Sequence, residues 1–462
     1  MAMRIRDLWS WAGEMSGRDY AKWGVLLFAI KYNLDRLLAN HAFHQPWYPW
    51  DYIAPGRGVM FRWAENESFA LSLMVLSVPF VVIGLAMTLR RLRTVGWPLW
   101  LAAMFFAPFL NWLFFLILSA VPSARERELP PVLSPPGPWP QWFRVRSRLA
   151  AASTAVTLVV VVVLPLVVLS TSVLKTYGLG LFFGIPFCTG LFATLLFSAA
   201  VPRTLGECLT VSLLAAAICG GMILAAAIEG LICLLMFAPL GAGMALLGGV
   251  FGHVIQRARW NTANSGRVYG VAWIGLPFLL IAEAQMPTTT PLIGVTTSVL
   301  IEGPPAVVWR HVVEFSELPA PTELVFRSGI AYPVRAHISG SGVGAVRQCE
   351  FSTGPFVEPI TVWDEPRRLA FDVTAQPHPM RELSPYRSLH PPHLDGFFRS
   401  RRGEFRLTEL PGGRTRLDGT TWYEQRLWPA AYWQTWSDWL VHAIHTRVLQ
   451  HIKFEAESAP IN

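Results

Sequence analysis

Runs of apolar residues that are long enough to cross a lipid bilayer recur through the first 285 residues of this chain. One of them reads "TAVTLVVVVVLPLVVL". A spanning helix needs about 20 predominantly apolar residues, and in lipid the helix is a form that satisfies its own backbone hydrogen bonds. Seven segments qualify, approximately at 68–89, 96–120, 149–172, 178–201, 208–228, 231–254 and 268–284. We therefore predict a multi-pass α-helical membrane domain.

An eighth segment, 23–39, has two interpretations. Its sequence "WGVLLFAIKYNLDRLLA" contains Lys31, Asp35 and Arg36, and charged side chains are expensive in lipid. Lys31 and Asp35 are four residues apart, so they could pair on one helix face. The segment is either an amphipathic helix in the membrane interface or a true span. The predicted count is therefore seven or eight helices.

This ambiguity decides the side on which the C-terminus lies. If 23–39 is interfacial and the N-terminus is cytoplasmic, the Arg clusters Arg125/Arg127/Arg144/Arg146/Arg148 and Arg257/Arg259/Arg267 lie inside and the C-terminus lies outside. If 23–39 spans, the arrangement is reversed. The positive-inside rule favours the first arrangement. We expect a protein of the bacterial cytoplasmic (inner) membrane, with its C-terminal part placed by this rule on the periplasmic side.

The composition argues against several functional classes. Apolar residues make up 53% of the chain and charged residues 15%, with a formal net charge of +8. The Arg residues form short clusters beside apolar segments, as in "LRRLRTVG", which is typical of contact with anionic lipid and does not indicate a nucleic-acid partner. The five cysteines have no paired spacing, and four lie in apolar runs. We expect no disulfide framework, no zinc site and no cofactor.

From residue 295 onward the pattern changes to strands and turns. The segment "VTTSVLIEG" alternates like a strand, and "PPAVVWRHVVEF" follows as a helix that Pro opens. Six further alternating segments end at Gly, Pro or Asp, and a helix of about 429–456 follows. Its residues Trp433, Trp436, Leu440, Ile444 and Val448 recur at spacings of three and four. This order predicts a curved antiparallel sheet around a long C-terminal helix, with a cavity between them.

This C-terminal part resembles the START-like helix-grip superfamily, also called SRPBCC, which includes lipid-transfer proteins and polyketide cyclases/dehydratases. The resemblance depends on "TTSVLIEGPPAVVW", "GSGVGAVRQCEF", "WDEPRRLAFDV", "GGRTRLDGTTWY" and the final helix. It implies an α+β helix-grip domain that binds a hydrophobic ligand. It does not imply chemistry, because one fold carries many functions.

The N-terminal part resembles a second family. The stretch "TLRRLRTVGWPLWLAAMFFAPFLNWLFFLILSAVPS" is similar to a family of small bacterial inner-membrane proteins of unknown function, and this resemblance implies no activity. We divide the chain into an N-terminal membrane region (1–120), a Pro-rich connector (121–148), a second membrane helical region (149–284) and the helix-grip domain (295–456).

The helix-grip part holds more aromatic residues than a core of its size needs. We expect several of them to line an apolar pocket, with Phe351, Phe356, Trp363, Phe371, Phe397, Trp422, Trp433 and Trp436 as the ligand-binding candidates. The expected ligand is a membrane lipid or another hydrophobic small molecule. The segment "LWPAAYWQTWSDWL" could alternatively rest on the lipid bilayer. The oligomeric state stays open.

Three groups of polar residues are candidates for chemistry. The insertion "HPMRELSPYRSLHPPHLDG" carries His378, Glu382, His390, His393 and Asp395, and it is a solvated loop, a lid over the cavity or a weak metal site. Asp438, His442 and His445 share one face of the last helix, and we expect that face to meet solvent or the membrane domain. Glu358 is a possible buried acid.

Three functions remain open. The first is membrane-anchored binding or transfer of an apolar molecule. The second is a cyclase/dehydratase-type enzyme acting on a membrane-derived substrate, with Glu358, His390 or His393 as acid/base candidates. The third is a sensing or assembly module without a cavity. An aromatic-lined cavity favours the first two, and a convergent acid/base pair within it favours the enzyme.

Overall fold

The computed structural model of the chain describes residues 8–52, 67–106, 110–120, 123, 147–257, 262–286, 290–386 and 389–458. The chain forms two compact units, which we call the N-terminal unit (Met1–Ala226 and Phe237–Thr289) and the C-terminal unit (Ala227–Met236 and Thr290–Asn462). The short segment Ala227–Met236 therefore leaves the helical part and joins the C-terminal unit. Most of the predicted connector 121–148, with Arg125, Arg127, Arg144 and Arg146, lies outside the described residues, as does Arg259.

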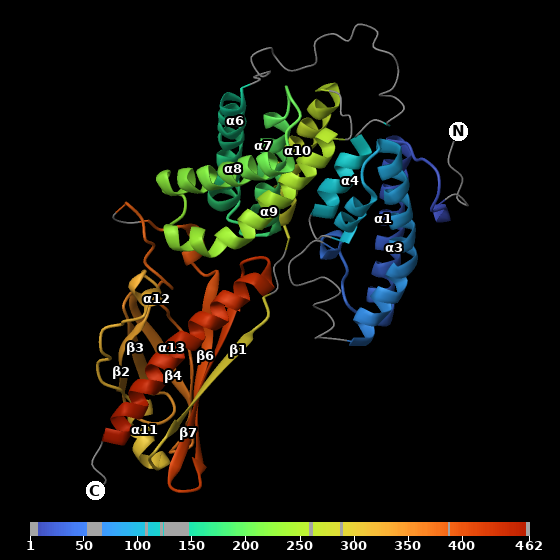
Figure 1. The fold of residues 1–462 in the computed structure, drawn as a ribbon. Coiled ribbons are helices and arrows are strands. Elements are labelled where there is room, and N and C mark those ends of the chain that lie inside the picture. Colours follow the sequence, from blue (N-terminus) through green and yellow to red (C-terminus); the bar gives the residue numbers. More distant parts are fainter. Residues whose placement is uncertain are drawn as a thin grey trace, which may run out of the picture. The chain divides into compact units, whose positions relative to one another are not determined.

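The N-terminal unit is helical, as its apolar runs predict (Figure 1). Its elements are α1 (Gly17–Ala42), η2 (Pro49–Tyr52), α3 (Glu67–Val95), η3 (Leu99–Phe106), α4 (Leu110–Ala120), α6 (Arg148–Val168), η5 (Leu169–Val173), η6 (Gly180–Gly184), α7 (Ile185–Phe197), α8 (Leu205–Ala225), α9 (Leu231–Arg257) and α10 (Thr262–Ala284). The first residues of α9 belong to the C-terminal unit.

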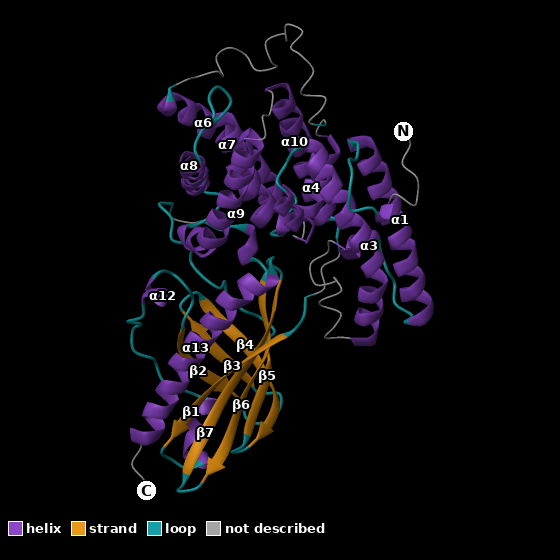
Figure 2. Cartoon of the chain, turned by 45° about the vertical axis from the view of Figure 1, so that its right-hand side comes forward, coloured by secondary structure: helices purple, strands orange, loops and turns teal. Residues whose placement is uncertain are grey.

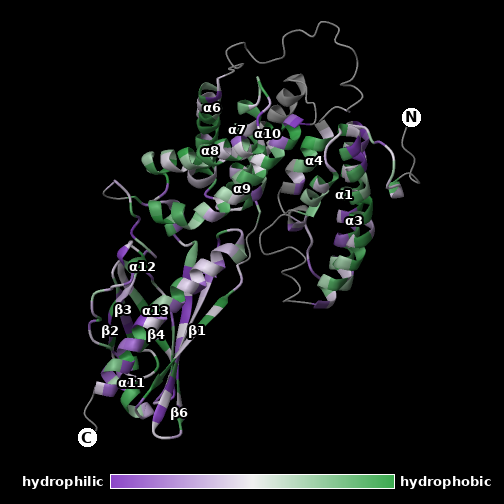
Figure 3. Cartoon of the chain, viewed as in Figure 1, coloured by the Kyte–Doolittle hydropathy of each residue, from purple (hydrophilic) through white to green (hydrophobic). Residues whose placement is uncertain are grey.

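Within the described residues, five helices are long and apolar enough to cross a membrane: Glu67–Val95, Arg148–Val173, Gly180–Phe197, Leu205–Ala225 and Leu231–Arg257. Figure 3 shows the hydrophobic stretches along α3, α6 and α8 in green. The expected spans 96–120 and 268–284 have a different form. The first consists of the separate short elements η3 and α4, and the apolar part of α10 is the shorter stretch Ile274–Ala284.

The two arginines of the Arg-Arg-Leu sequence near the end of α3 donate hydrogen bonds to backbone carbonyls within the protein. Arg90 and Arg91 are buried. Arg91 donates from Nε to the Leu118 carbonyl at 2.8 Å and from Nη1 to the Met15 carbonyl at 3.1 Å, and Arg90 donates to the Glu14 carbonyl at 3.1 Å. Our interpretation of this cluster as a lipid-contacting one is wrong for these two residues, because they satisfy carbonyls near the ends of α4 and α1.

Two charged residues of α1, Lys31 and Asp35, are also satisfied within the protein, whereas Arg36 is exposed. Lys31 pairs with Asp35 one turn later, and the Tyr52 hydroxyl donates to the same carboxylate. Asp35 has no exposed area and Lys31 is 9% exposed. The pair therefore faces the packed side of α1, while Val25, Leu26 and Leu37 are exposed. This distribution gives α1 an apolar outer side, so the structure leaves both interpretations of 23–39 open.

Small residues bring α7, α8 and α9 close together. A methyl group placed on Gly190 of α7 would lie 1.8 Å from the Ala245 carbonyl oxygen, and one on Gly248 of α9 would lie 2.0 Å from the Phe187 carbonyl oxygen. On the next side of α9, Gly249 faces Ser212 of α8. Contacts this close need residues without side chains. Small residues at four-residue spacing commonly permit such close packing between membrane helices.

The C-terminal unit is the predicted strand–helix–strands–helix fold. Its elements are β1 (Ile293–Ile301), α11 (Pro305–Val313), α12 (Leu324–Arg327), β2 (Pro333–Ser339), β3 (Val346–Phe351), β4 (Gly354–Asp364), β5 (Arg368–Asp372), η7 (Pro392–Leu394), β6 (Phe398–Leu410), β7 (Arg414–Gln425) and α13 (Ala430–Ser458). The strands form one sheet in the order β1-β7-β6-β5-β4-β3-β2, and each neighbouring pair is antiparallel.

The sheet curls around α13, which crosses its concave side (Figure 2). Leu449 and Ile452 of α13 pack with Leu417 of β7 and Leu369 of β5 in one buried core, which α11 closes with Val308 and Trp309. The other half of α13 has fewer core partners. The inner face of the sheet and this half of the helix enclose the cavity described below.

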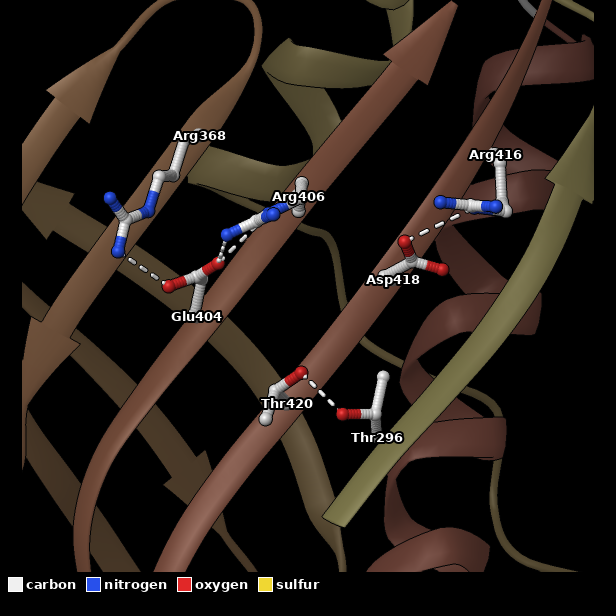
Figure 4. Close-up of polar contacts among 7 residues, drawn as sticks. All are labelled: Thr296, Arg368, Glu404, Arg406, Arg416, Asp418 and Thr420. Atoms are coloured by element: carbon white, nitrogen blue, oxygen red, sulfur yellow. Dashed lines mark hydrogen bonds and ion pairs between the residues drawn. The ribbon is translucent and has the colours of Figure 1, made fainter. Parts of the chain in front are cut away.

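The other face of the sheet is polar. Glu404 of β6 receives hydrogen bonds from Arg368 at 2.8 Å and from Arg406 at 3.0 Å, and Arg416 donates to Asp418 of the same strand at 3.2 Å. These side chains lie on the side of the strands away from α13 (Figure 4). Alternate residues of the same strands, such as Phe405 and Leu417, belong to the core, so the expected period-two pattern is confirmed here.

Candidate functional site: the helix-grip cavity

A cavity of about 210 Å³ lies between the inner face of the sheet and α13. This volume counts the space open to the centre of a water-sized sphere, and one water molecule needs roughly 10–15 Å³ of it. The cavity therefore suits a ligand of more than a dozen non-hydrogen atoms. The five apolar residues that recur along the last helix all line it: Trp433, Trp436, Leu440, Ile444 and Val448. The walls are mostly apolar, which favours a hydrophobic ligand.

Six of the eight predicted ligand-binding aromatics line this cavity: Phe351, Phe356, Phe371, Phe397, Trp433 and Trp436. The rings of Phe351 and Phe356 are 4.6 Å apart between centroids, so they form one continuous part of the wall. Gly403 lies under the Phe371 ring, where a methyl group would approach it to 2.4 Å. A residue without a side chain at this point of β6 leaves room for that ring.

The other two predicted aromatics lie elsewhere. Trp422 belongs to the outer face, because its neighbour Tyr423 is fully buried on the inner face, and the Arg402 guanidinium lies over its ring at 4.3 Å. Trp363 is on the inner side but packs edge-on against Trp309 of α11, with centroids 5.6 Å apart. It therefore contributes to the core beyond the cavity. Neither residue is among those that line the cavity.

One buried ion pair forms part of the cavity wall. Arg347 of β3 and Glu358 of β4 are direct cross-strand neighbours, and they are paired through Nη1 and Oε2. Burial raises the pKa of the Glu358 carboxyl, and the guanidinium opposes this rise. Arg347 also donates to the Val313 carbonyl at 3.2 Å, and the rings of Phe315, Phe371 and Phe405 surround its guanidinium at 5.4–5.6 Å. Sequence reasoning found Glu358 and missed Arg347.

Asp438 and His445 on the polar face of α13 pack on the sheet, so our expectation that this face meets solvent or the membrane domain is wrong for these two residues, whereas His442 is exposed. Tyr423 of β7 donates to Asp438 at 2.6 Å. His445 lies 2.8 Å from the Thr421 hydroxyl and 3.1 Å from the Thr297 hydroxyl. Burial, with His442 nearby, lowers the pKa of His445 to about 4. The inner faces of β1 and β7 supply hydroxyl partners, which is why polar residues fit here.

The loop between β5 and β6 divides into an exposed and a buried part. His390 lies 3.0 Å from Asp395, and its ring is 4.4 Å from that of His378. All three residues are exposed. His393, on η7, is instead buried and lines the cavity. Of the predicted acid/base candidates, Glu358 and His393 thus lie in the cavity wall and His390 lies on the surface.

His393 belongs to a cluster that no sequence pattern indicated. Glu229 and Cys233 come from the segment that joins the C-terminal unit, and Glu382 comes from the same loop as His393. Cys233 donates to Glu382 at 2.7 Å. Burial raises the pKa of the Glu382 carboxyl, while this hydrogen bond lowers it. Cys233 and His393 are separated by 160 positions in the chain, so spacing could not have connected them.

Comparison with known proteins agrees with the two resemblances. Residues 293–453 match the sequence profile of the family described as polyketide cyclase/dehydrase and lipid transport. Residues 9–128 match the profile of DUF805, a family described as protein of unknown function. No curated protein shows a significant sequence match to the chain.

Three solved structures that are similar to the chain each cover 36–37% of it. The aromatase/cyclase ZhuI from Streptomyces sp. R1128 is 15% identical over 36% of this chain and 94% of its own, with a TM-score of 0.25. Norcoclaurine synthase from Thalictrum flavum, solved with dopamine and hydroxybenzaldehyde, is 9% identical over 37% and 91%, with a TM-score of 0.26. XoxI from Bacillus cereus is 14% identical over 36% and 96%, with a TM-score of 0.24.

The sheet order, the long helix and the match over residues 293–453 all concern the same part of the chain. This chain therefore combines a C-terminal helix-grip domain that is similar to the polyketide cyclase/dehydrase and lipid transport family with an N-terminal region that is similar to DUF805.

Proposed function

We propose that this protein holds a lipid or another hydrophobic small molecule in its helix-grip cavity beside the membrane. The observation that carries the proposal is the cavity of about 210 Å³, which nine phenylalanine and tryptophan residues line together with the aliphatic residues of α13. Each methylene buried from water contributes about 0.8 kcal/mol, whereas a typical hydrogen bond contributes about 1 kcal/mol. Ten buried methylenes therefore outweigh one or two hydrogen bonds, and an apolar chain suits this space.

The N-terminal part anchors this binding domain. In our proposal, 1–120 and 149–284 are the membrane regions, 121–148 connects them, and seven or eight helices cross or lie in the bacterial inner membrane. Five helices of sufficient length and hydropathy support this assignment. Anchoring places the cavity where an apolar ligand dissolves, so binding would not depend on the very low concentration of such a ligand in water.

The test is ligand retention in the full-length protein. Trp436 lines the cavity, while Trp439 on the same helix is 50% exposed and is not among the lining residues. We expect Trp436→Ala to weaken the binding of a fluorescent fatty-acid probe by about 10- to 100-fold, because one large apolar side chain contributes about 1.5–3 kcal/mol. Trp439→Ala is the matched control, and it should bind like the parent protein.

Native mass spectrometry of the purified protein would show whether a lipid from the membrane is retained. If Trp436→Ala and Trp439→Ala bind the probe equally well, or the parent retains no apolar molecule, the proposed binding function is wrong. Circular dichroism and size-exclusion chromatography would establish that both variants are folded.

A second function is favoured by one observation. His393 and Cys233 lie in the cavity wall, so a reactive site could act on a bound molecule, as the cyclase/dehydratase interpretation requires. Glu358 suits this function less well, because its carboxylate is already engaged by Arg347. Conversion of a bound lipid that His393→Ala abolishes, while probe binding is unchanged, would favour an enzyme over a carrier.

A further inference from the structure

The cluster Glu229, Cys233, Glu382 and His393 is built from two segments that the backbone holds together. The Leu231 amide donates to the Leu383 carbonyl at 2.9 Å, and the Arg381 amide donates to the Gly329 carbonyl at 2.8 Å. At Gly230 a methyl group would lie 1.9 Å from Oε2 of Glu382. The absence of a side chain at this position allows the Glu382 carboxylate to lie against the backbone, directed at Cys233.

Three of the four side chains present donor atoms at spacings that suit one metal ion. Cys233 Sγ lies 2.7 Å from Glu382 Oε1 and 3.1 Å from His393 Nε2, and Nε2 lies 3.9 Å from Oε1. Zinc–sulfur bonds of about 2.3 Å and zinc–nitrogen or zinc–oxygen bonds of about 2.0–2.1 Å place the donors of a tetrahedral site roughly 3.3–3.6 Å apart. The observed distances lie on both sides of this range.

The fourth side chain faces the other nitrogen of the imidazole. Oε2 of Glu229 lies 3.3 Å from His393 Nδ1. An Nδ1–H that donates to a carboxylate leaves Nε2 with its lone pair directed at Cys233 and Glu382. Metal-binding histidines are commonly oriented in this way by a carboxylate, which also raises the basicity of the ligating nitrogen.

The charges of the cluster point to a cation. Two carboxyl groups and a thiol lie together, with side-chain exposure of 0% for Glu382, 10% for Glu229 and 9% for His393. Oε2 of Glu382 is buried and has no hydrogen-bond partner among the described residues. Buried anionic groups are costly unless they are paired or coordinate a metal. The ion-pair partner that the structure gives the Glu382 carboxylate is His393, at 3.9 Å.

The same geometry resembles an activated thiol, since Cys233, His393 and Glu229 follow one another as nucleophile, base and orienting acid. The Glu382 carboxylate argues against this alternative. At 2.7 Å from Sγ its negative charge would oppose the thiolate that such a nucleophile needs. A divalent cation removes this conflict, because it is stabilised by both negative groups.

We propose that Cys233, Glu382 and His393 bind one divalent transition-metal ion, with zinc the best match to the sulfur, nitrogen and oxygen donors, and that Glu229 orients His393. Cys233 and His393 also line the cavity. The fourth coordination position is therefore open to the cavity, as in catalytic zinc sites, and suits an oxygen of water or of an anionic head group. The proposal concerns metal binding and does not depend on which molecule occupies the cavity.

The experiment uses the full-length protein in detergent, stripped with a chelator and then dialysed against zinc or cobalt. We expect one zinc ion per chain by elemental mass spectrometry, and a cobalt spectrum with the thiolate-to-metal charge-transfer band. Cys233→Ser should lose that band, and His393→Ala should lose the bound metal. Glu229→Gln should keep the band but bind zinc about 10- to 100-fold more weakly.

Two variants serve as controls. His390→Ala alters the exposed His378/His390/Asp395 group, and Cys349→Ser alters a buried thiol whose pKa burial raises to about 12; both should retain one zinc per chain. The proposal would be overturned if the parent and the double variant Cys233→Ser/His393→Ala contained equal amounts of metal. It would also be overturned if the charge-transfer band survived in Cys233→Ser. A metal-free parent whose Cys233 reacts rapidly with iodoacetamide in a His393-dependent way would overturn it as well, since that outcome identifies a nucleophile. If His393→Ala does not fold, Cys233→Ser and Glu229→Gln decide the outcome.

Discussion

Arg347 is the residue on which the inner face of the C-terminal sheet most depends. It is 2% exposed and pairs with Glu358, which is 6% exposed. Removing one partner of a buried pair leaves an uncompensated charge and costs about 3–5 kcal/mol. We therefore expect Arg347→Met to lower the free energy of unfolding of the C-terminal unit by about that amount, measured by denaturant titration followed through tryptophan fluorescence.

The double variant Arg347→Met/Glu358→Gln provides the control. It removes both charges, so it should recover a large part of the lost stability, because apolar or neutral replacements of a whole buried pair are often tolerated. If the double variant is no more stable than Arg347→Met, the loss comes from the packing of Phe315, Phe371 and Phe405 around the guanidinium, and the charge argument fails.

Alternation alone did not fix side-chain direction in the strands. Leu369, Ala370 and Phe371 of β5 are all buried, so no alternating pattern shows which way the Phe371 ring points. Trp422 looks like a wall residue in the sequence, and its place on the outer face becomes clear only once its strand is registered against Gly294 and Arg402. The contact of Cys233 with Glu382 spans 149 positions, so only the folded chain could bring these two residues together.

At the scale of helices, α9 has glycines on a side that packs against another helix and on a side that is open. Gly248 faces the backbone of α7, where a side chain would collide with the Phe187 carbonyl, whereas Gly243 is exposed and a methyl group added there would have no atom within 4 Å. Gly248 and Gly252 are four residues apart, a spacing that is typical of close helix packing, but this spacing does not identify α7 as the partner. A small residue permits close approach without specifying the neighbour.

The two glycines make a matched pair for testing this packing. We expect Gly248→Leu to force α7 and α9 apart and to lower the midpoint of thermal unfolding in detergent, because overpacking commonly costs about 1–3 kcal/mol or more when backbone blocks the side chain. Gly243→Leu adds the same side chain to an open position and should leave the midpoint within about a degree of the parent protein. Equal losses in both variants would show that leucine is harmful for another reason, such as altered insertion.

At the scale of the whole chain, the segment Ala227–Met236 restricts how the helices cross the membrane. This segment belongs to the C-terminal unit, where Ile232 packs with Phe326, Ile330 and Met380. The chain leaves that unit along α9 and returns to it at residue 290, so it must cross the membrane an even number of times in between. α9 is long enough to span, and we therefore expect α10 to span as well, since its 23 residues cover about 34 Å at 1.5 Å each.

The same reasoning predicts which side each end occupies. Three candidate spans, containing α6, α7 and α8, separate residue 147 from the segment Ala227–Met236, so Ser147 and the C-terminal unit lie on opposite sides. Arg148 and Arg257 then share one side, which the positive-inside rule identifies as the cytoplasm.

We expect Ser458→Cys, in the full-length protein, to react with a membrane-impermeant maleimide in spheroplasts, and Ser147→Cys to react only after permeabilisation. The parent protein measures background labelling of the five native cysteines, which are free in the structure. Labelling of both introduced cysteines under the same condition would mean that an even number of helices crosses between them. Because α9 and α10 return the chain to the same unit, one of the three candidate spans that contain α6, α7 and α8 would then not cross the membrane.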